Sequence, residues 1–200
     1  MSIHATRAIR VITAAGLLAT VASADESTTD ERAMMSGRSG WSSSALVTVG
    51  ESTGGYRLPG KLDGLGAYRK DDDTVRVLIN HELSDDSAYK YGLASGAQLR
   101  GARVSYVDVD RRTREVCGAG LAYDTIYDRR GRVVEDGSQV NETFSVSGGL
   151  DRLCSGRLVL AGQRGFEDTI WFCGEETSAD GSHPHGGSEW ALDVASMSLR

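Results

Sequence analysis

Alternating apolar and polar positions run through the chain from residue 45 onward, and they predict short β-strands separated by turns. The clearest alternation spans residues 74–80, where β-branched apolar side chains occupy every second position. An acidic turn at residues 70–73 precedes this run, and residues 62–68 are its predicted hairpin partner. The pattern is typical of an all-β protein. Further strands are predicted at residues 45–49, 103–109, 121–127, 132–135, 169–173 and 190–194.

No segment has a convincing helical stripe. Residues 84–99 are the best helical candidate, but Gly92 and Gly96 lower helix propensity there, so an ordered loop is the alternative. The 25 glycines against two prolines are typical of tight β-turns. Many short strands without helices favour a sandwich, a barrel or a propeller.

The length of the chain narrows this choice. At roughly 40–50 residues for a four-stranded blade, about 175 mature residues make some three to four blades. We therefore predict an incomplete β-propeller, the N-terminal part of a truncated chain. A complete small sandwich is the alternative.

The first 24 residues have the three parts of a cleaved export signal. Arg7 and Arg10 form a basic region, residues 11–21 are small and apolar, and residues 22–24 (Ala-Ser-Ala) supply the cleavage site. An apolar run of about eleven residues is too short for a bilayer, which takes about 20. We expect a secreted or periplasmic protein with no membrane span in the mature chain. Its organisation is a signal peptide at 1–24, a flexible polar lead-in at 25–44 and one domain at 45–200.

The mature chain is acidic. Removing Arg7 and Arg10 from the 22 basic residues leaves 20 against 28 acidic residues, a formal charge of −8. No basic stretch alternates with aromatic residues, so we expect no nucleic-acid partner. An acidic protein repels a phosphorylated substrate unless bound cations reverse the sign of the local potential.

Two predicted strands end in acidic residues, and strand ends are a usual place for functional side chains on a β scaffold. Asn80, His81 and Glu82 follow one strand, and their oxygen atoms suit hard cations such as calcium. The alternative is a turn with a solvated Glu82. Glu175 and Glu176 follow another strand; a nearby cation is one way to keep two adjacent carboxylates ionised, although exposed ones need no cation.

The three cysteines, Cys117, Cys154 and Cys173, allow at most one disulfide in an oxidising compartment. Cys154 lies in a glycine-rich neighbourhood and is a disulfide partner for either of the others. It is alternatively a thiolate metal ligand, which favours a transition metal over calcium. Composition does not decide between the two.

No Gly-x-Ser-x-Gly, Walker or His-Glu-x-x-His motif is present, so a serine-triad hydrolase with these motifs is not supported. An ordered set of short blocks instead resembles the PhoX-type alkaline phosphatase family. The blocks are LDGLGAY at residues 62–68, VLINHE at 77–82, GARVS at 101–105, RLCS at 152–155 and WFCGEE at 171–176.

The resemblance implies a propeller-like fold with a site that holds iron and calcium ions and hydrolyses phosphate monoesters. It makes Cys154 a candidate iron ligand. Glu175 and Glu176 match the family's Cys-Glu-Glu stretch, with Gly174 inserted, and Glu82 matches the Asn-His-Glu block. These four residues form the predicted metal site, and no catalytic residue is assigned.

Three departures from the family qualify this expectation. The signal lacks adjacent arginines, residues 156–168 lack a Trp-Gly-Thr-Trp-like stretch, and the family's C-terminal half supplies further ligands and a phosphate-contacting arginine beyond residue 200. We expect a secreted metal-dependent phosphatase-like protein acting on a small phosphorylated substrate, with this 200-residue chain inactive alone. The alternative is a non-catalytic extracellular β-propeller that binds calcium or a macromolecular partner.

Overall fold

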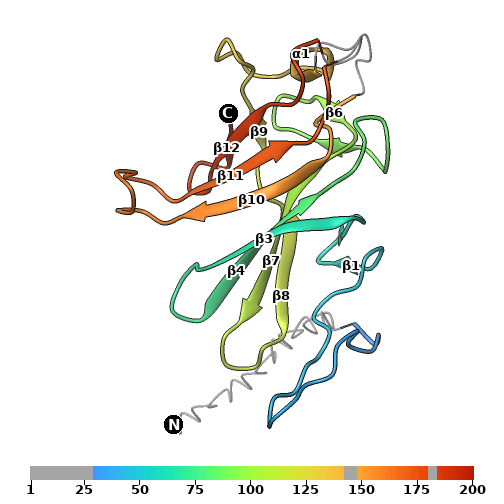
Figure 1. Cartoon of the computed structure of the whole chain (residues 1–200), viewed down its shortest axis with the longest axis vertical. Helices are drawn as coiled ribbons and strands as arrows, with labels where there is room; N and C mark the ends of the chain where they lie inside the picture. Colours follow the sequence, from blue (N-terminus) through green and yellow to red (C-terminus); the bar gives the residue numbers. More distant parts are fainter. Residues whose placement is uncertain (1–28, 142–147, 180–183) are drawn as a thin grey trace, which may run out of the picture.

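The computed structural model describes residues 29–141, 148–179 and 184–200, and these form an all-β architecture, as predicted. Two sheets dominate, and no sheet of the described residues closes on itself (Figure 1). The predicted export signal at 1–24 lies outside the described residues. The remaining elements are the two-residue pairs β1 (Ser52–Thr53) with β2 (Tyr56–Arg57) and β5 (Tyr91–Gly92) with β6 (Gln98–Leu99), and the short helix α1 (Ser138–Asn141).

The first sheet has four antiparallel strands in chain order. They are β3 (Leu62–Arg69), β4 (Thr74–His81), β7 (Arg103–Asp110) and β8 (Val116–Leu121). The β4–β7 register is continuous from Thr74 opposite Asp110 to His81 opposite Arg103. Between these strands the chain makes the excursion that contains β5 and β6, so the predicted alternative of an ordered loop at 84–99 is confirmed.

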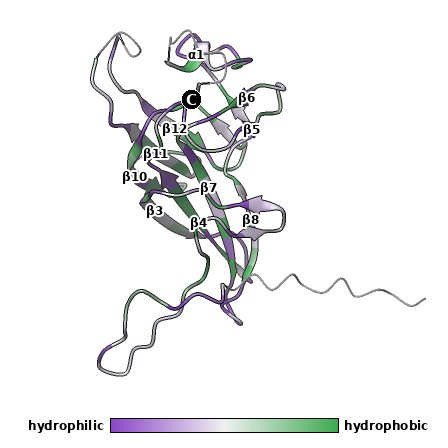
Figure 2. Ribbon diagram, turned by 90° about the vertical axis from the view of Figure 1, so that its right-hand side faces the viewer, coloured by the Kyte–Doolittle hydropathy of each residue, from purple (hydrophilic) through white to green (hydrophobic). Residues whose placement is uncertain are grey.

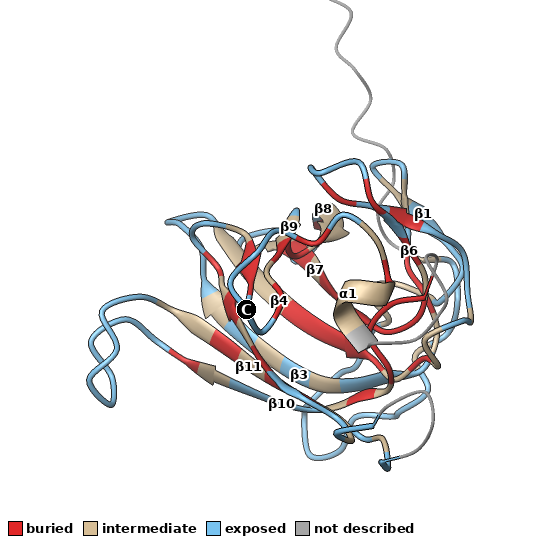
Figure 3. Cartoon of the chain, turned by 90° about the horizontal axis from the view of Figure 1, so that it is seen from above, coloured by how far each residue is buried: buried red, intermediate tan, exposed pale blue. Residues whose placement is uncertain are grey.

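The second sheet is an antiparallel series of four strands with a fifth strand added in parallel. The series is β10 (Leu153–Val159), β11 (Ile170–Glu175), β12 (Glu189–Asp193) and β13 (Ser198–Leu199). β9 (Thr125–Ile126) pairs in parallel with β13. β9 therefore lies at the edge of the second sheet opposite β10, although it precedes the other four strands in the sequence. The hairpin between β10 and β11 extends outward and is largely exposed (Figures 1 and 3).

Trp171 joins the two sheets. Its side chain is completely buried, and a Cβ added at Gly66 or Gly156 would lie 2.3 Å or 2.2 Å from its ring. The indole Nε1 donates to Asn80 Oδ1 at 2.9 Å, and Asn80 Nδ2 donates to the Ser155 carbonyl at 2.7 Å. Because both positions are glycine, the two backbones can approach the ring closely. The buried side-chain amide of Asn80 has hydrogen-bond partners in the second sheet for both its oxygen and its nitrogen.

The main hydrophobic core lies around this joint. Side chains from both sheets contribute, including Leu78, Val104, Leu153 and Leu192. Figure 2 shows the same apolar concentration along the central strands, and Figure 3 shows the end of β4 among the buried segments. A smaller cluster, built on Ile79, Val107 and Val116, covers the opposite face of the first sheet.

The strongest alternations gave correct strands: the predictions at 62–68, 74–80, 103–109, 169–173 and 190–194 correspond to β3, β4, β7, β11 and β12. Two predictions were wrong. Residues 45–49 form no strand, because Leu46 and Val47 pack onto the first sheet without joining its ladder. Residues 132–135 form only an isolated bridge between Val133 and Tyr127. The predicted strand at 121–127 is divided between β8 and β9.

Candidate functional site

Three of the segments that contain predicted ligands meet at one end of the two sheets. The Glu82 backbone N–H donates to the Lys61 carbonyl at 2.9 Å, next to the start of β3. The Arg152 N–H donates to the Leu83 carbonyl at 2.8 Å, and the Glu176 N–H donates to the Arg152 carbonyl at 2.9 Å. Backbone hydrogen bonds therefore connect the end of β4, the start of β10 and the end of β11.

Cys154 and Glu176 lie together within this end. Burial raises the pKa of the Cys154 thiol, and the Glu176 carboxylate raises it further through its charge and through a hydrogen bond from the thiol. Asp63 on β3 contributes a smaller effect in the same direction. The site therefore places negative charge beside a neutral thiol. A cation bound there would favour the thiolate form of Cys154.

Glu175 points to a different place, although it is adjacent to Glu176. Its Oε1 accepts a hydrogen bond from the Asp151 N–H at 2.8 Å, and its Oε2 accepts one from the Ser188 N–H at 3.0 Å. Glu175 is the last residue of β11, and these two backbone groups hold its carboxylate, whereas the carboxylate of Glu176 lies beside Cys154. Glu175 therefore fixes the chain on either side of β11.

The described residues contain no group of three or more His, Cys, Asp or Glu side chains placed to hold a metal ion. The structure brings Cys154 and Glu176 together and holds Glu82 in a neighbouring segment, so ligation by these residues stays a prediction. All three cysteines are free thiols. Cys173 is buried in the core, and burial raises its pKa strongly, whereas Cys117 is exposed.

A cavity of about 200 Å³ lies on the other side of β11. Apolar and charged side chains both line it, among them Tyr127, Val140, Glu175, Glu189, Trp190 and Arg200. Glu175 is the one predicted ligand in its lining, and Glu82, Cys154 and Glu176 are not part of it. The cavity is therefore separate from the Cys154–Glu176 pair.

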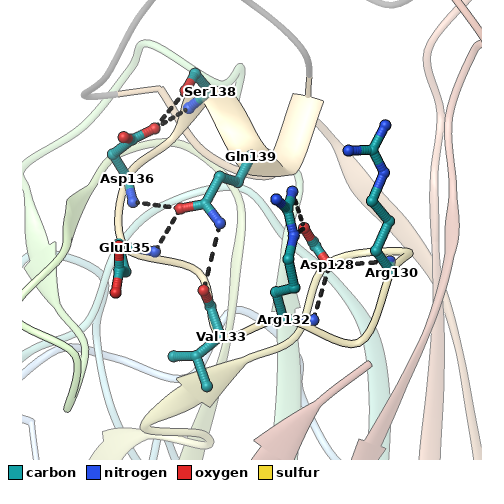
Figure 4. Close-up of polar contacts among 8 residues, drawn as sticks. All are labelled: Asp128, Arg130, Arg132, Val133, Glu135, Asp136, Ser138 and Gln139. Atoms are coloured by element: carbon teal, nitrogen blue, oxygen red, sulfur yellow. Dashed lines mark hydrogen bonds and ion pairs between the residues drawn. The ribbon is translucent and has the colours of Figure 1, made fainter.

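Asp128, in a turn, and Gln139, in α1, line this cavity, and local hydrogen bonds hold both side chains (Figure 4). Asp128 accepts hydrogen bonds from the backbone N–H groups of Arg130 and Arg132, each at 2.9 Å, and from the Arg132 guanidinium at 2.8 Å. Gln139 Oε1 accepts a hydrogen bond from the Glu135 N–H at 2.7 Å. The side chains of Asp128 and Gln139 are engaged in these local hydrogen bonds, so we assign both residues a structural role.

His81 belongs to a buried chain of hydrogen bonds rather than to the candidate metal site. Its Nδ1 lies 3.0 Å from the Gly60 carbonyl, which can only accept, so Nδ1 carries the proton. Nε2 therefore accepts from the Ser105 hydroxyl at 2.7 Å, and Ser105 in turn accepts from the Tyr56 hydroxyl at 2.6 Å. A serine paired with histidine is typical of hydrolases, but here both side chains are completely buried.

Arg103 lies beside this chain and is also completely buried. Its guanidinium stacks on the rings of Tyr89 and Tyr91, at 4.8 Å and 4.3 Å from their centroids. It donates to the carbonyls of Gly101 and Tyr89, while its Nη1 has no hydrogen-bond partner among the described residues. The two aromatic faces stabilise the cation in place of a carboxylate.

No protein-family model, curated protein or solved structure matches the chain. No helix in the described ranges is long and apolar enough to cross a membrane. The predicted ligands were Glu82, Cys154, Glu175 and Glu176; Asp63, whose charge acts on Cys154 from β3, was not among them. The acid at the start of the LDGLGAY block was the available signal for it.

We predict that Glu176→Gln makes Cys154 more reactive. The neutral amide lacks the negative charge that raises the pKa of the thiol, so more thiolate is present at a given pH. The rate of alkylation of Cys154 by iodoacetamide, followed by mass spectrometry between pH 7 and 10, should rise at lower pH in the variant. Glu167→Gln, on the exposed β10–β11 loop, is the control and should leave the profile unchanged.

Proposed function

We propose that this protein is a secreted, metal-dependent phosphatase-like protein whose cation site lies at the end of the sheets where Cys154 and Glu176 meet. The observation that supports the proposal is the convergence of three ligand-bearing segments, joined by backbone hydrogen bonds around the Cys154–Glu176 pair. Cys154 and Glu176 would bind the metal directly, with Glu82 as a further ligand. Iron and calcium are the ions implied by the resemblance to PhoX-type phosphatases.

The electrostatics give the cation a role in this proposal. The chain has a net charge of −6 over its full length, and the proposed site adds carboxylates around a thiol. A phosphate monoester is repelled by such a surface unless a cation reverses the local potential. A bound cation would also polarise the phosphoryl oxygen. The chain's own residues would hold the cation and orient the site.

We further propose that the two sheets are neighbouring blades of a β-propeller. Both contain four antiparallel strands in chain order, and the first strands of the two series, β3 and β10, lie against each other. A propeller repeats four-stranded sheets around an axis, with the first strand of each blade innermost. The close approach of Gly64 on β3 to the backbone of Gly156 on β10 fits this arrangement.

Metal content tests the proposed site. The full chain, stripped with chelator and dialysed against iron or calcium, is expected to retain metal. Cys154→Ser and Glu176→Gln should each weaken binding by about tenfold or more, since losing even an outer partner of a metal ligand costs on the order of 10–100-fold. Elemental analysis and calorimetric titration measure the effect.

Cys117→Ser is the matched control, because it removes an exposed thiol from the first sheet and should leave binding unchanged. The 200-residue chain is expected to be inactive alone, so hydrolysis of p-nitrophenyl phosphate by the metal-loaded chain, lost in Cys154→Ser, would support the enzymatic proposal and overturn that expectation. A chain that retains neither metal would contradict the proposed site.

A second candidate is a non-catalytic extracellular protein that binds calcium or a macromolecular partner. One observation favours a macromolecular partner: Met34, Met35 and Trp41 are exposed apolar side chains. Calcium retention without iron binding or phosphate release would select this candidate over the enzyme.

A further inference from the structure

The cavity beside β11 is a second candidate site, separate from the Cys154–Glu176 pair. Its volume is about 200 Å³, and an apolar cavity of about 150 Å³ is large enough to hold benzene. The cavity therefore has room for a small organic molecule that carries one ring. The proposed metal site makes no use of this space.

The apolar wall of the cavity belongs to the side of the second sheet that packs on the first. Trp190 lies in this wall and pairs with Cys173 across β11 and β12, and both side chains belong to the main core. Val140 also lines the cavity and packs against that core from α1, which Figure 1 shows at this end of the sheet. Phe172 and Ala191 pair on the opposite face, where a further blade would pack. The wall is therefore held by core packing and does not lie on that face.

Arg200 places a positive charge in the lining of the cavity. Its guanidinium lies over the ring of Tyr127, 4.3 Å from the ring centroid. Within the part of the chain that the structure describes, no hydrogen bond or ion pair engages this guanidinium. A guanidinium held over an aromatic ring keeps its N–H donors for a carboxylate, which it can bind through two parallel hydrogen bonds.

Trp190 adds a hydrogen-bond donor to the same wall. The residue is 6% exposed, and its indole Nε1 is buried without a hydrogen-bond partner among the described residues. A buried donor without a partner is costly, so nearly all such groups in folded proteins have one. A ligand acceptor bound beside the indole would remove this cost.

Glu175 supplies the opposite charge. Its two carboxylate oxygens accept the Asp151 and Ser188 N–H groups, at 2.8 Å and 3.0 Å. A carboxylate has about four acceptor positions, so these backbone bonds fix the group and still allow it to accept from a ligand. The lining of the cavity thus combines a cation, an anion and an apolar wall.

We propose that this cavity binds a small zwitterion with an apolar side chain, of the class of free apolar α-amino acids. The ligand carboxylate binds Arg200 and accepts the Trp190 N–H, and the ligand ammonium group donates to Glu175. The ligand side chain packs on Val140 and on the Trp190 ring. Glu175 repels a purely anionic ligand and Arg200 repels a purely cationic one, so the lining selects a molecule that carries both charges.

Calorimetric titration of the full chain with three ligands of similar size tests the site, with chelator present so that metal binding does not contribute. L-phenylalanine should bind. Phenylpropionate lacks the ammonium group and phenethylamine lacks the carboxylate, so each should bind at least about tenfold more weakly, as expected when a charged hydrogen bond is lost. Arg200→Gln should weaken L-phenylalanine binding by a similar factor without weakening phenethylamine. Arg157→Gln, at an exposed arginine of β10 outside the lining, is the matched control and should bind normally.

Val140→Phe should weaken all three ligands, because the larger side chain fills the cavity, and circular dichroism checks that every variant keeps the sheet fold. No heat from L-phenylalanine at millimolar concentration would overturn the proposal. Equal affinity for the three ligands would also overturn it, since the cavity would then recognise the ring and not the charges. L-phenylalanine binding that survives both Arg200→Gln and Val140→Phe would place the ligand elsewhere and contradict the proposed site.

Discussion

Replacing Trp171 with alanine should lower the free energy of unfolding by about 3–5 kcal/mol, the range found for large aromatic truncations in cores. The side chain is fully buried, and it fills the space left by two glycines, one from each sheet. Its loss leaves a cavity at the joint between the sheets, where neither Gly66 nor Gly156 has a side chain to fill it. Urea denaturation followed by circular dichroism measures the effect.

Trp171→Phe separates the contribution of packing from that of the hydrogen bond. The phenyl ring keeps most of the apolar contact but removes the N–H that Asn80 Oδ1 accepts. A buried acceptor without a partner costs about 1–3 kcal/mol, so this variant should lie between the native protein and Trp171→Ala. Phe166→Ala, at a partly exposed ring, is the control and should cost less than either. Equal loss in Trp171→Phe and Phe166→Ala would contradict the proposed joint.

The same joint explains why one long strand escaped prediction. β10 contains Ser155 and Gly156 at its centre, and both have low β propensity. Gly156 is required there because the ring of Trp171 occupies the place of a side chain. The partner that makes glycine necessary lies on the next strand, and a local pattern does not contain that information. β4 and β7 were predictable because their alternation reflects burial along each strand itself.

The break within residues 121–127 has a similar cause. Leu121 pairs with Ser105 in the first sheet, whereas Thr125 pairs with Ser198 in the second. The chain changes sheets within a short apolar segment, and the partner of Thr125 is distant in sequence. The alternation correctly indicated β structure, but pairing between distant segments determined where one strand ended and the other began.

The candidate site was predicted at the level of segments but not of side-chain direction. Strand-end reasoning located Glu82 and the two adjacent acids, and the family resemblance indicated Cys154; the structure places those segments at one end of the sheets. It could not separate Glu175 from Glu176, because which of them faces Cys154 depends on the β10–β11 register. That register shifts between Leu153 and Ser155, directly beside the cysteine.

His81 should make the protein less stable as the pH falls from about 6.5 towards 4. Burial lowers the pKa of the imidazole to about 4; the hydrogen bond to Gly60 opposes this, and the charge of Arg103 adds to it. The unfolded chain therefore binds a proton near pH 6.5 while the folded chain does not. The stability from neutral His81 is fully present above pH 6.5 and is lost progressively down to about pH 4, by about 3 kcal/mol in total.

The geometry explains why the folded protein resists this proton. Protonated Nε2 could no longer accept from Ser105, so the link from Ser105 to Tyr56 would have to rearrange beside the buried Arg103 cation. The free energy of unfolding, measured by urea titration at intervals from pH 7.5 to 4, should fall more steeply in the native protein than in His81→Leu. That variant should be less stable at pH 7.5, because it loses both ring hydrogen bonds, but it lacks the titrating group.

His185→Gln, which changes an exposed histidine, is the matched control and should retain the native dependence on pH. Comparing the two variants removes the contribution of carboxylates, which titrate in all three proteins. Parallel curves for the native protein and His81→Leu would show that the imidazole is not held neutral. If the two free energies of unfolding instead converge between pH 6.5 and 4, the loss of stability originates at His81, in the buried hydrogen bonds that connect β4 to β7 and to Tyr56.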